Sequence, residues 1–281
     1  MRSSGERPVP LSGVGLTFGS IVSIQVGAAI AKTLFPLLGS GGVVFLRVFL
    51  AALILLAVWR PRLRARSRGD YLLLLAFGLS LAGMNGGFYA ALDRIPLGVA
   101  VTLEFIGPLA VAVAASRRPR DLLIVALAAC GVLLLSPIGS TRIDGLGAAI
   151  ALVAGAFWAA YIVLAARVGR AFPGGGGLAL AMTVAGVALF PYGIAGGHDL
   201  LSPAALAGGL GVALLSSAIP YSLELEALRR LPARVFSILL SLEPAVAAAA
   251  GFVILGEGMV AREVIAVGLV VTASVAAALE R

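Results

Sequence analysis

Residues 41–59 read GGVVFLRVFLAALILLAVW, and this stretch decides the fold class. A helix rises ~1.5 Å per residue, so a run of roughly 20 residues crosses the ~30 Å hydrocarbon core of a bilayer. Arg47 is the only charged residue in the stretch, and residues 51–59 are apolar on every face. A membrane-spanning β-strand would alternate apolar and polar residues instead. The stretch therefore predicts a transmembrane α-helix, whose backbone polar groups all pair within the segment.

The rest of the chain repeats this pattern. Of its 281 residues, 60% are hydrophobic and 12% are charged, whereas soluble domains are nearer half apolar and one quarter charged. Loops that contain Pro, Gly and Arg separate the apolar runs. The sequence predicts an all-α integral membrane protein with about ten transmembrane helices, near residues 14–35, 41–59, 71–92, 97–115, 122–138, 146–166, 177–195, 204–227, 233–254 and 263–280.

The 21 Lys and Arg residues are distributed unevenly between the two sets of loops that alternate along these spans. Sixteen fall in the set that includes both termini, four fall in the other set, and the last one is Arg47. The positive-inside rule therefore predicts a multi-pass protein of the inner cell membrane with both termini in the cytoplasm. This distribution explains the net charge of +8 without a nucleic-acid partner.

An internal repeat aligns the two halves of the chain at an offset of 136 residues. Residues 91–96 read ALDRIP and residues 227–232 read ALRRLP, and at the same offset Pro108 matches Pro244. The predicted repeat units are residues 1–138 and residues 139–281, each with five spans. Because five is odd, the two units would face opposite ways across the membrane, an arrangement that recurs in transporters.

The polar residues argue against catalysis. All five Asp residues lie in loops or at the ends of predicted spans, so the paired carboxylates of intramembrane aspartyl proteases and prenyl transferases are missing. His198 and Cys130 are the only residues of their types, and the sequence contains neither HExxH nor a Walker A motif. We therefore predict no catalytic residue, no metal site and no cofactor. A lipid-modifying membrane enzyme is the less favoured alternative.

Three charged residues near the middle of predicted spans are the main functional candidates: Arg47, Glu104 and Glu243. A charge inside a bilayer costs roughly 2.5–3.5 kcal/mol on insertion scales, so such a residue indicates a function by default. Arg47 and Glu104 lie at about the same predicted depth, and Asn85 joins this layer. Two interpretations stay open. Arg47 and Glu104 form a structural ion pair, or Glu104 lines a cavity and binds a cationic group or a proton.

Two prolines accompany the carboxylates. Glu243 directly precedes Pro244, and Glu104 precedes Pro108 by one helical turn. Proline removes a helix hydrogen bond and bends the helix, and the freed carbonyl needs a new partner. A kink beside a carboxylate in each half is the pattern expected of a binding site near the midplane, although packing geometry alone explains the kinks equally well.

Polar side chains on other predicted spans extend the candidate set. Tyr89 and Tyr221 are predicted to line the path of a substrate. Glu224 and Glu226 lie near the cytoplasmic end of the eighth predicted span, close to Arg230, so interfacial salt bridges are the expected role of both carboxylates.

Two parts of the chain resemble the EamA repeats of the drug/metabolite transporter superfamily. The first contains NGGFYAALDRIPLGVA at residues 85–100 and LEFIGPLA at residues 103–110. The second contains SAIPYSLE at 217–224, RRLPAR at 229–234 and LSLEPA at 240–245. The likeness is closest to the threonine/homoserine exporter branch and covers nearly the whole chain. It implies ten helices in two inverted five-helix repeats and proton-coupled export of amino acids or related metabolites.

The residues and the resemblance together predict a secondary active transporter that exports small metabolites such as threonine or homoserine. Arg47 is expected to face the carboxylate of the substrate, and Glu104 with Asn85 its amine. Either Glu104 or Glu243 is expected to carry the exchanged proton. Export of other metabolites or of drug-like cations is the alternative. The expected partners are a small-molecule substrate and the lipid bilayer, and the oligomeric state stays open.

Overall fold

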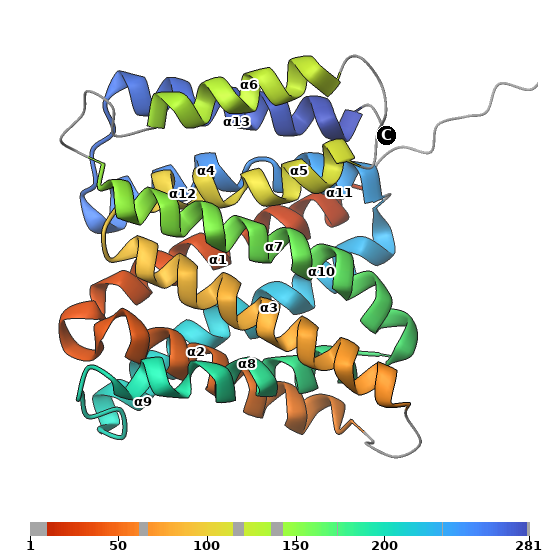
Figure 1. Ribbon diagram of the computed structural model, residues 1–281, viewed down its shortest axis with the longest axis vertical. Helices are drawn as coiled ribbons and strands as arrows, with labels where there is room; N and C mark the ends of the chain where they lie inside the picture. The colour runs from red at the N-terminus through yellow and green to blue at the C-terminus, as the bar shows by residue number, and fades with distance from the viewer. Residues whose placement is uncertain are drawn as a thin grey trace, which may run out of the picture.

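The computed structural model describes residues 10–61, 67–114, 121–135, 143–172, 174–231 and 233–279. All regular secondary structure in these ranges is helical (Figure 1), which confirms the predicted all-α class. Six helical segments there are long and apolar enough to cross a membrane: α1 (Leu11–Thr33), α2 (Phe35–Trp59), α3 (Arg68–Leu92), α7 (Gly145–Ala171), α8 (Gly176–Ile194) and the segment Pro203–Glu224. The chain is therefore a multi-pass membrane protein, while the count of ten spans stays a prediction.

The other described helices are shorter or interrupted. The segment that follows α8 consists of α9 (Pro203–Ala213), the π-helical turn η1 (Leu214–Ala218) and α10 (Ile219–Arg230). The remaining helices are α4 (Leu97–Glu104), α5 (Ile106–Ala114), α6 (Asp121–Leu135), α11 (Ala233–Leu240), α12 (Glu243–Leu255) and α13 (Ala261–Leu279).

Helices from the two halves of the chain pack side by side (Figure 1). The pair α6 and α13 forms one edge of the bundle, and α2, α8 and α9 lie at the opposite edge. Between these edges, α3 packs on α7 and α8, α1 packs on α10, and α12 packs on α4. The largest buried cluster of apolar side chains runs mainly along α2, α3 and α4. Each of the helix pairs named above joins the two halves of the chain, and this cluster also contains residues of α7 and α8, so the described parts of both halves share it.

Two predicted spans are interrupted at equivalent places. The predicted span 97–115 breaks at Phe105, between α4 and α5. The predicted span 233–254 breaks at Ser241 and Leu242, between α11 and α12. The last helical residues before the breaks are Glu104 and Leu240, which lie four residues before Pro108 and Pro244. A proline has no N–H to donate to the carbonyl four residues earlier, so each helix loses a hydrogen bond where it breaks.

The broken helix lies against α7 at unusually short range, and glycines make this possible. A Cβ atom added to Gly107 on α5 would overlap the backbone of Gly155 on α7. A Cβ atom added to Gly155 would lie 2.5 Å from the carbonyl oxygen of Glu104. The backbone that carries Glu104 is therefore held directly against α7, with no side chain between the two.

A polar cluster ties three helix ends together at the end of the bundle where α1 finishes. Lys32 on α1 donates to Glu257 Oε1 at 2.7 Å and to the Ile95 carbonyl at 3.0 Å. Glu257, which follows α12, also accepts from the Leu97 N–H at 2.8 Å. This bond satisfies one of the unpaired N–H groups at the start of α4, where Pro96 supplies no side-chain cap. The cluster therefore joins the first half of the chain to the second.

Candidate functional site

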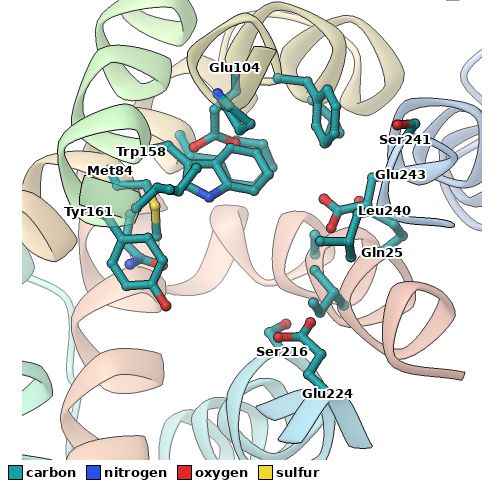
Figure 2. A pocket seen from close by; sticks show the side chains of 18 of the residues that line it. Gln25, Met84, Glu104, Trp158, Tyr161, Ser216, Glu224, Leu240, Ser241 and Glu243 are labelled. Carbon is teal, nitrogen blue, oxygen red and sulfur yellow. The ribbon is translucent and has the colours of Figure 1, made fainter. Parts of the chain in front are cut away.

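A cavity of about 420 Å³ lies in the middle of the bundle (Figure 2). Its walls come from the helices α1, α2, α3, α4, α5, α7, η1, α10, α11 and α12, and from the break between α11 and α12. Among the predicted residues, those that line it are Arg47, Asn85, Glu104, Pro108, Tyr221 and Glu243. Two predicted residues do not reach the lining: Tyr89 lies behind Arg47, and Pro244 is buried next to Glu243. The structure thus brings together charged residues that are nearly 200 positions apart in sequence.

Arg47 is held in place from three sides. Its Nη1 donates to the Tyr89 hydroxyl at 3.3 Å, its Nη2 donates to the Ser216 carbonyl at 3.1 Å, and its Nε lies 3.5 Å from Ser217 Oγ. The guanidinium also lies over the Tyr89 ring, with 5.4 Å between Cζ and the ring centroid. All these partners are uncharged, so the positive charge of Arg47 remains available to an anion in the cavity.

Pro220 follows Ser216 by four residues and cannot donate the α-helical hydrogen bond to the Ser216 carbonyl. In an α-helix the N–H of residue 220 would bind the carbonyl of Ser216, and in a π-helix it would bind that of Leu215. Proline donates to neither, and both carbonyls accept from side chains instead: Leu215 from Ser23 Oγ at 2.6 Å, and Ser216 from Arg47. The π-helical turn thus supplies an anchor for Arg47.

Arg47 and Glu104 do not form the ion pair that was one of the two interpretations of their equal predicted depth in the membrane. Both line the cavity, but no nitrogen–oxygen contact within 4.0 Å joins them. The reason is that Arg47 points toward Tyr89 and the π-helical turn, while Glu104 is held against α7. Within the described ranges, the carboxylates of Glu104 and Glu243 have no hydrogen-bond partner, although the two residues are only 7% and 6% exposed. Two buried carboxylates without partners indicate a site that is completed by a ligand or a proton.

Asn85 and the aromatic residues shape the wall near Glu104. Asn85 Nδ2 donates to the Leu81 carbonyl at 2.9 Å, which leaves its amide oxygen for other contacts. Trp158 packs edge-on against Phe105, with 5.6 Å between ring centroids. Figure 2 shows Trp158 and Tyr161 beside Glu104, on the same side of the cavity. Sequence reasoning missed Trp158, because nothing in the sequence showed which face of α7 turns inward.

Glu224 corrects the expectation of an interfacial salt bridge. Its carboxylate lines the cavity and accepts from Ser20 Oγ on α1 at 2.8 Å. Glu226, two residues later, does form the expected ion pair, with 2.6 Å between its Oε1 and Arg230 Nη2. Two residues on a helix differ by about 200° in direction, so one points into the bundle and the other to its surface. The position of Glu224 one turn after Pro220 was the available signal.

The described lining contains one guanidinium, three carboxylates and several uncharged polar groups. Such a cavity can bind a small molecule that carries both a negative and a positive group, with the anion at Arg47. Among the described residues, no group of three or more His, Cys, Asp or Glu residues is arranged to hold a metal ion. The three carboxylates enter from different helices, and both aromatic or apolar residues and uncharged polar residues line the cavity around them.

Comparisons with known proteins agree with this geometry. Residues 145–279 match the model of the EamA-like transporter family. The chain is 45% identical over 260 residues to the threonine/homoserine exporter RhtA of Salmonella typhimurium (strain SL1344), a match that covers 92% of this chain and 88% of the relative. It is 44% identical over 263 residues to the threonine/homoserine exporter RhtA of Escherichia coli (strain K12), covering 92% and 89%.

A crystal structure of a protein with 16% sequence identity superimposes with a TM-score of 0.62, over 95% of this chain and 97% of that chain, so the two share a fold. The named relatives are transporters and not enzymes, which confirms the resemblance seen in the sequence. The present chain is accordingly a membrane transporter. Its identity to these relatives extends over nine-tenths of its length, and the chain therefore belongs to the EamA-like transporter family, alongside the RhtA exporters.

Proposed function

We propose that this transporter exports small amino acids, threonine or homoserine among them, across the inner membrane in exchange for protons. The names of the relatives motivate the substrate class. The observation that carries the proposal is Arg47, which is fixed by neutral partners at the wall of a cavity that also contains the unpartnered carboxylate of Glu104. A free amino acid has one anionic and one cationic group, and this cavity offers a counter-charge to each.

In the proposed complex, Arg47 binds the carboxylate of the substrate, while Glu104 and Asn85 bind its amine. Tyr89 acts through Arg47, and Tyr221 contributes to the wall of the cavity. Glu104 or Glu243 carries the exchanged proton. Both carboxylates are buried, so their charged forms are disfavoured unless a cation or a proton balances them.

The proposal includes two inverted five-helix repeats, residues 1–138 and 139–281, with ten spans in total and both termini in the cytoplasm. The two helix breaks support the repeats, because Glu104 and Leu240 are separated by the same 136 positions as Pro108 and Pro244. The uneven distribution of Lys and Arg supports the orientation. In this arrangement the halves rock around the cavity and expose it to each side in turn.

The experiment is counterflow of labelled threonine in proteoliposomes that contain the purified protein. Arg47→Ala removes a charge-assisted hydrogen bond to the substrate, worth about 1.5–3 kcal/mol, and is expected to raise KM at least about tenfold. Glu104→Gln is expected to do the same through the amine. His198→Ala, outside the cavity, is the matched control. Retained threonine exchange by folded Arg47→Ala and Glu104→Gln proteins would refute the residue assignment.

Absence of threonine and homoserine flux from folded wild-type protein would remove the amino-acid assignment. A panel of other metabolites and drug-like cations would then be tested in the same vesicles. The three carboxylates and the aromatic wall of the cavity favour cations as the first of these alternatives.

A further inference from the structure

The two sides of the cavity differ in chemistry. Figure 2 shows Glu104, Trp158 and Tyr161 on one side. Glu243, Gln25, Ser216 and Glu224 gather on the other, from α12, α1, η1 and α10. We call this second group the carboxylate side. The proposed counter-charges for the substrate are Arg47 and Glu104, so the carboxylate side borders the substrate at Arg47, which bonds to the Ser216 carbonyl, but supplies neither counter-charge.

The carboxylate side contains two buried polar atoms without a hydrogen-bond partner, an amide oxygen and a hydroxyl. Gln25 Oε1 and Ser216 Oγ are buried and have no hydrogen-bond partner, and their residues are 2% and 1% exposed. Two neighbouring donor groups are already engaged: Ser20 Oγ bonds to Glu224, and each of the three guanidinium nitrogens of Arg47 has a partner of its own. A buried Gln oxygen normally accepts a hydrogen bond, so a donor is missing here.

The charges around the cavity point to the nature of that donor. The described titratable groups that face it are Arg47, Glu104, Glu224, Glu243, Tyr161 and Tyr221. A zwitterionic substrate adds no net charge, so three carboxylates would face one guanidinium. Glu243 and Glu224 line the same side of the cavity, as Figure 2 shows. Neighbouring carboxylates in a medium of low dielectric share protons instead of ionising together. A protonated carboxyl also has an O–H to donate, which an ionised carboxylate does not have.

We propose that Glu224 and Glu243 together hold the coupling proton, and that Gln25 and Ser216 accept a hydrogen bond from the protonated carboxyl. Ser20 is a positioning residue, because it orients the Glu224 carboxylate from α1. A proton from water on one side of the membrane joins a carboxylate oxygen of the pair, and it leaves to water on the other side after the cavity changes its exposure. This inference rests on the proposed exchange with protons and assigns its proton site.

Chemical modification tests the proton site without any substrate. Dicyclohexylcarbodiimide adds to protonated carboxylic acids in apolar surroundings, and mass spectrometry of peptides locates the product. The expected result for wild-type protein in lipid vesicles is modification of Glu224 or Glu243 that decreases as the pH is raised. The absence of modification at both residues at every pH would overturn the proposal.

Transport measurements test the coupling. The Glu224→Gln variant is expected to reduce threonine accumulation driven by a pH gradient at least about tenfold more than it reduces counterflow without a gradient. Ser20→Ala is expected to reduce gradient-driven accumulation less than Glu224→Gln does, and to shift the pH dependence of that accumulation. Glu226→Gln, two residues along α10 and outside the cavity, is the matched control and is expected to match wild type in both assays. Gradient-driven accumulation by Glu224→Gln equal to that of wild type would overturn the assignment, and so would equal losses in the two assays.

The two proposals fail in distinguishable ways. Modification of the carboxylate pair without threonine counterflow in wild-type protein would overturn the substrate and support the proton site. Threonine counterflow without modification of the pair would support the substrate and overturn the proton site.

Discussion

Replacing Gly155 by alanine is the most direct test of how this fold positions Glu104. Gly155 lies on α7 where that helix meets the break between α4 and α5. The added Cβ atom would lie 2.5 Å from the carbonyl oxygen of Glu104 and 3.3 Å from its Cα. Both neighbours are backbone atoms, which cannot turn aside as a flexible side chain would. The two helices must therefore move apart by several tenths of an ångström at the residue that faces the cavity.

The expected cost follows from overpacking. Extra atoms in a well-packed interior cost about 1–3 kcal/mol through shifts of backbone and side chains. Gly169, on the same helix, is the matched control, because a Cβ atom added there meets nothing within 4 Å. At that position alanine is expected to stabilise the helix by about 0.4–1 kcal/mol through its lower unfolded-state entropy and better helix propensity. The change from glycine to alanine is thus expected to lower the free energy of unfolding at Gly155 and to raise it at Gly169, although both residues lie on α7.

The assay has two parts. Thermal unfolding in detergent, followed by circular dichroism, is expected to give a lower midpoint for Gly155→Ala and an equal or higher midpoint for Gly169→Ala. Counterflow in proteoliposomes is expected to show a higher KM for Gly155→Ala only, because Glu104 is displaced. A Gly155→Ala protein with the midpoint and KM of wild type would refute the claim that backbone contact with α7 positions Glu104.

Three further predictions concern groups around the cavity and at its ends. Pro220→Ala supplies an N–H that competes with Ser23 for the Leu215 carbonyl in the π-helical turn, and with Arg47 for the Ser216 carbonyl in an α-helical turn, so the KM of counterflow is expected to rise several-fold. An unchanged KM would contradict this role of the proline. Glu257→Ala leaves the Lys32 cation without its counter-charge and an N–H of α4 without its acceptor, and it is expected to cost about 1–3 kcal/mol in unfolding measurements. An unfolding free energy equal to that of wild type would contradict this role of Glu257. The side-chain hydrogen bond from Arg94, supported by the Leu146 backbone N–H, lowers the pKa of Asp144. Wild type is therefore expected to be more stable than Asp144→Asn at neutral pH, and this difference is expected to disappear as the pH falls below ~3.9. A stability difference that did not change with pH would contradict this expectation.

The functional candidates that sequence alone could identify were those that are costly for a membrane protein to retain. Arg47, Glu104 and Glu243 stand out because a charge in the middle of an apolar run has no role in forming the helix. The structure places all three at one cavity. Equal depth was a weaker guide, since Arg47 and Glu104 share a cavity but do not pair. Depth follows from the rise per residue, whereas the direction of a side chain depends on how its helix is rotated against its neighbours.

Helix rotation also explains the residues that were missed or misread. Trp158 and Ser216 lie in segments that are apolar or small on every face, so no polar stripe shows which face turns inward. Glu224 was interpreted as an interfacial residue because arginines follow it in sequence. Its actual partner, Ser20, lies 204 positions away on α1, and only the packing of α1 on α10 brings the two together.

The sequence by itself determined that this chain is an all-helical, multi-pass membrane protein, because continuous apolar runs of membrane length lack the alternation of barrel strands and satisfy their backbone as helices. Its EamA-like motifs indicated a transporter family. The sequence also indicated bends near Pro108 and Pro244, since a proline cannot donate to the carbonyl four residues before it, although Pro191 lies inside α8 without a break. Only the tertiary structure decided which side chains share the cavity, that Arg47 binds a π-helical carbonyl and not Glu104, and that Glu224 faces inward. These features depend on contacts between helices that are far apart in the chain, and such contacts are set by the close fit of small residues such as Gly107 and Gly155, which carries no local signal in the sequence.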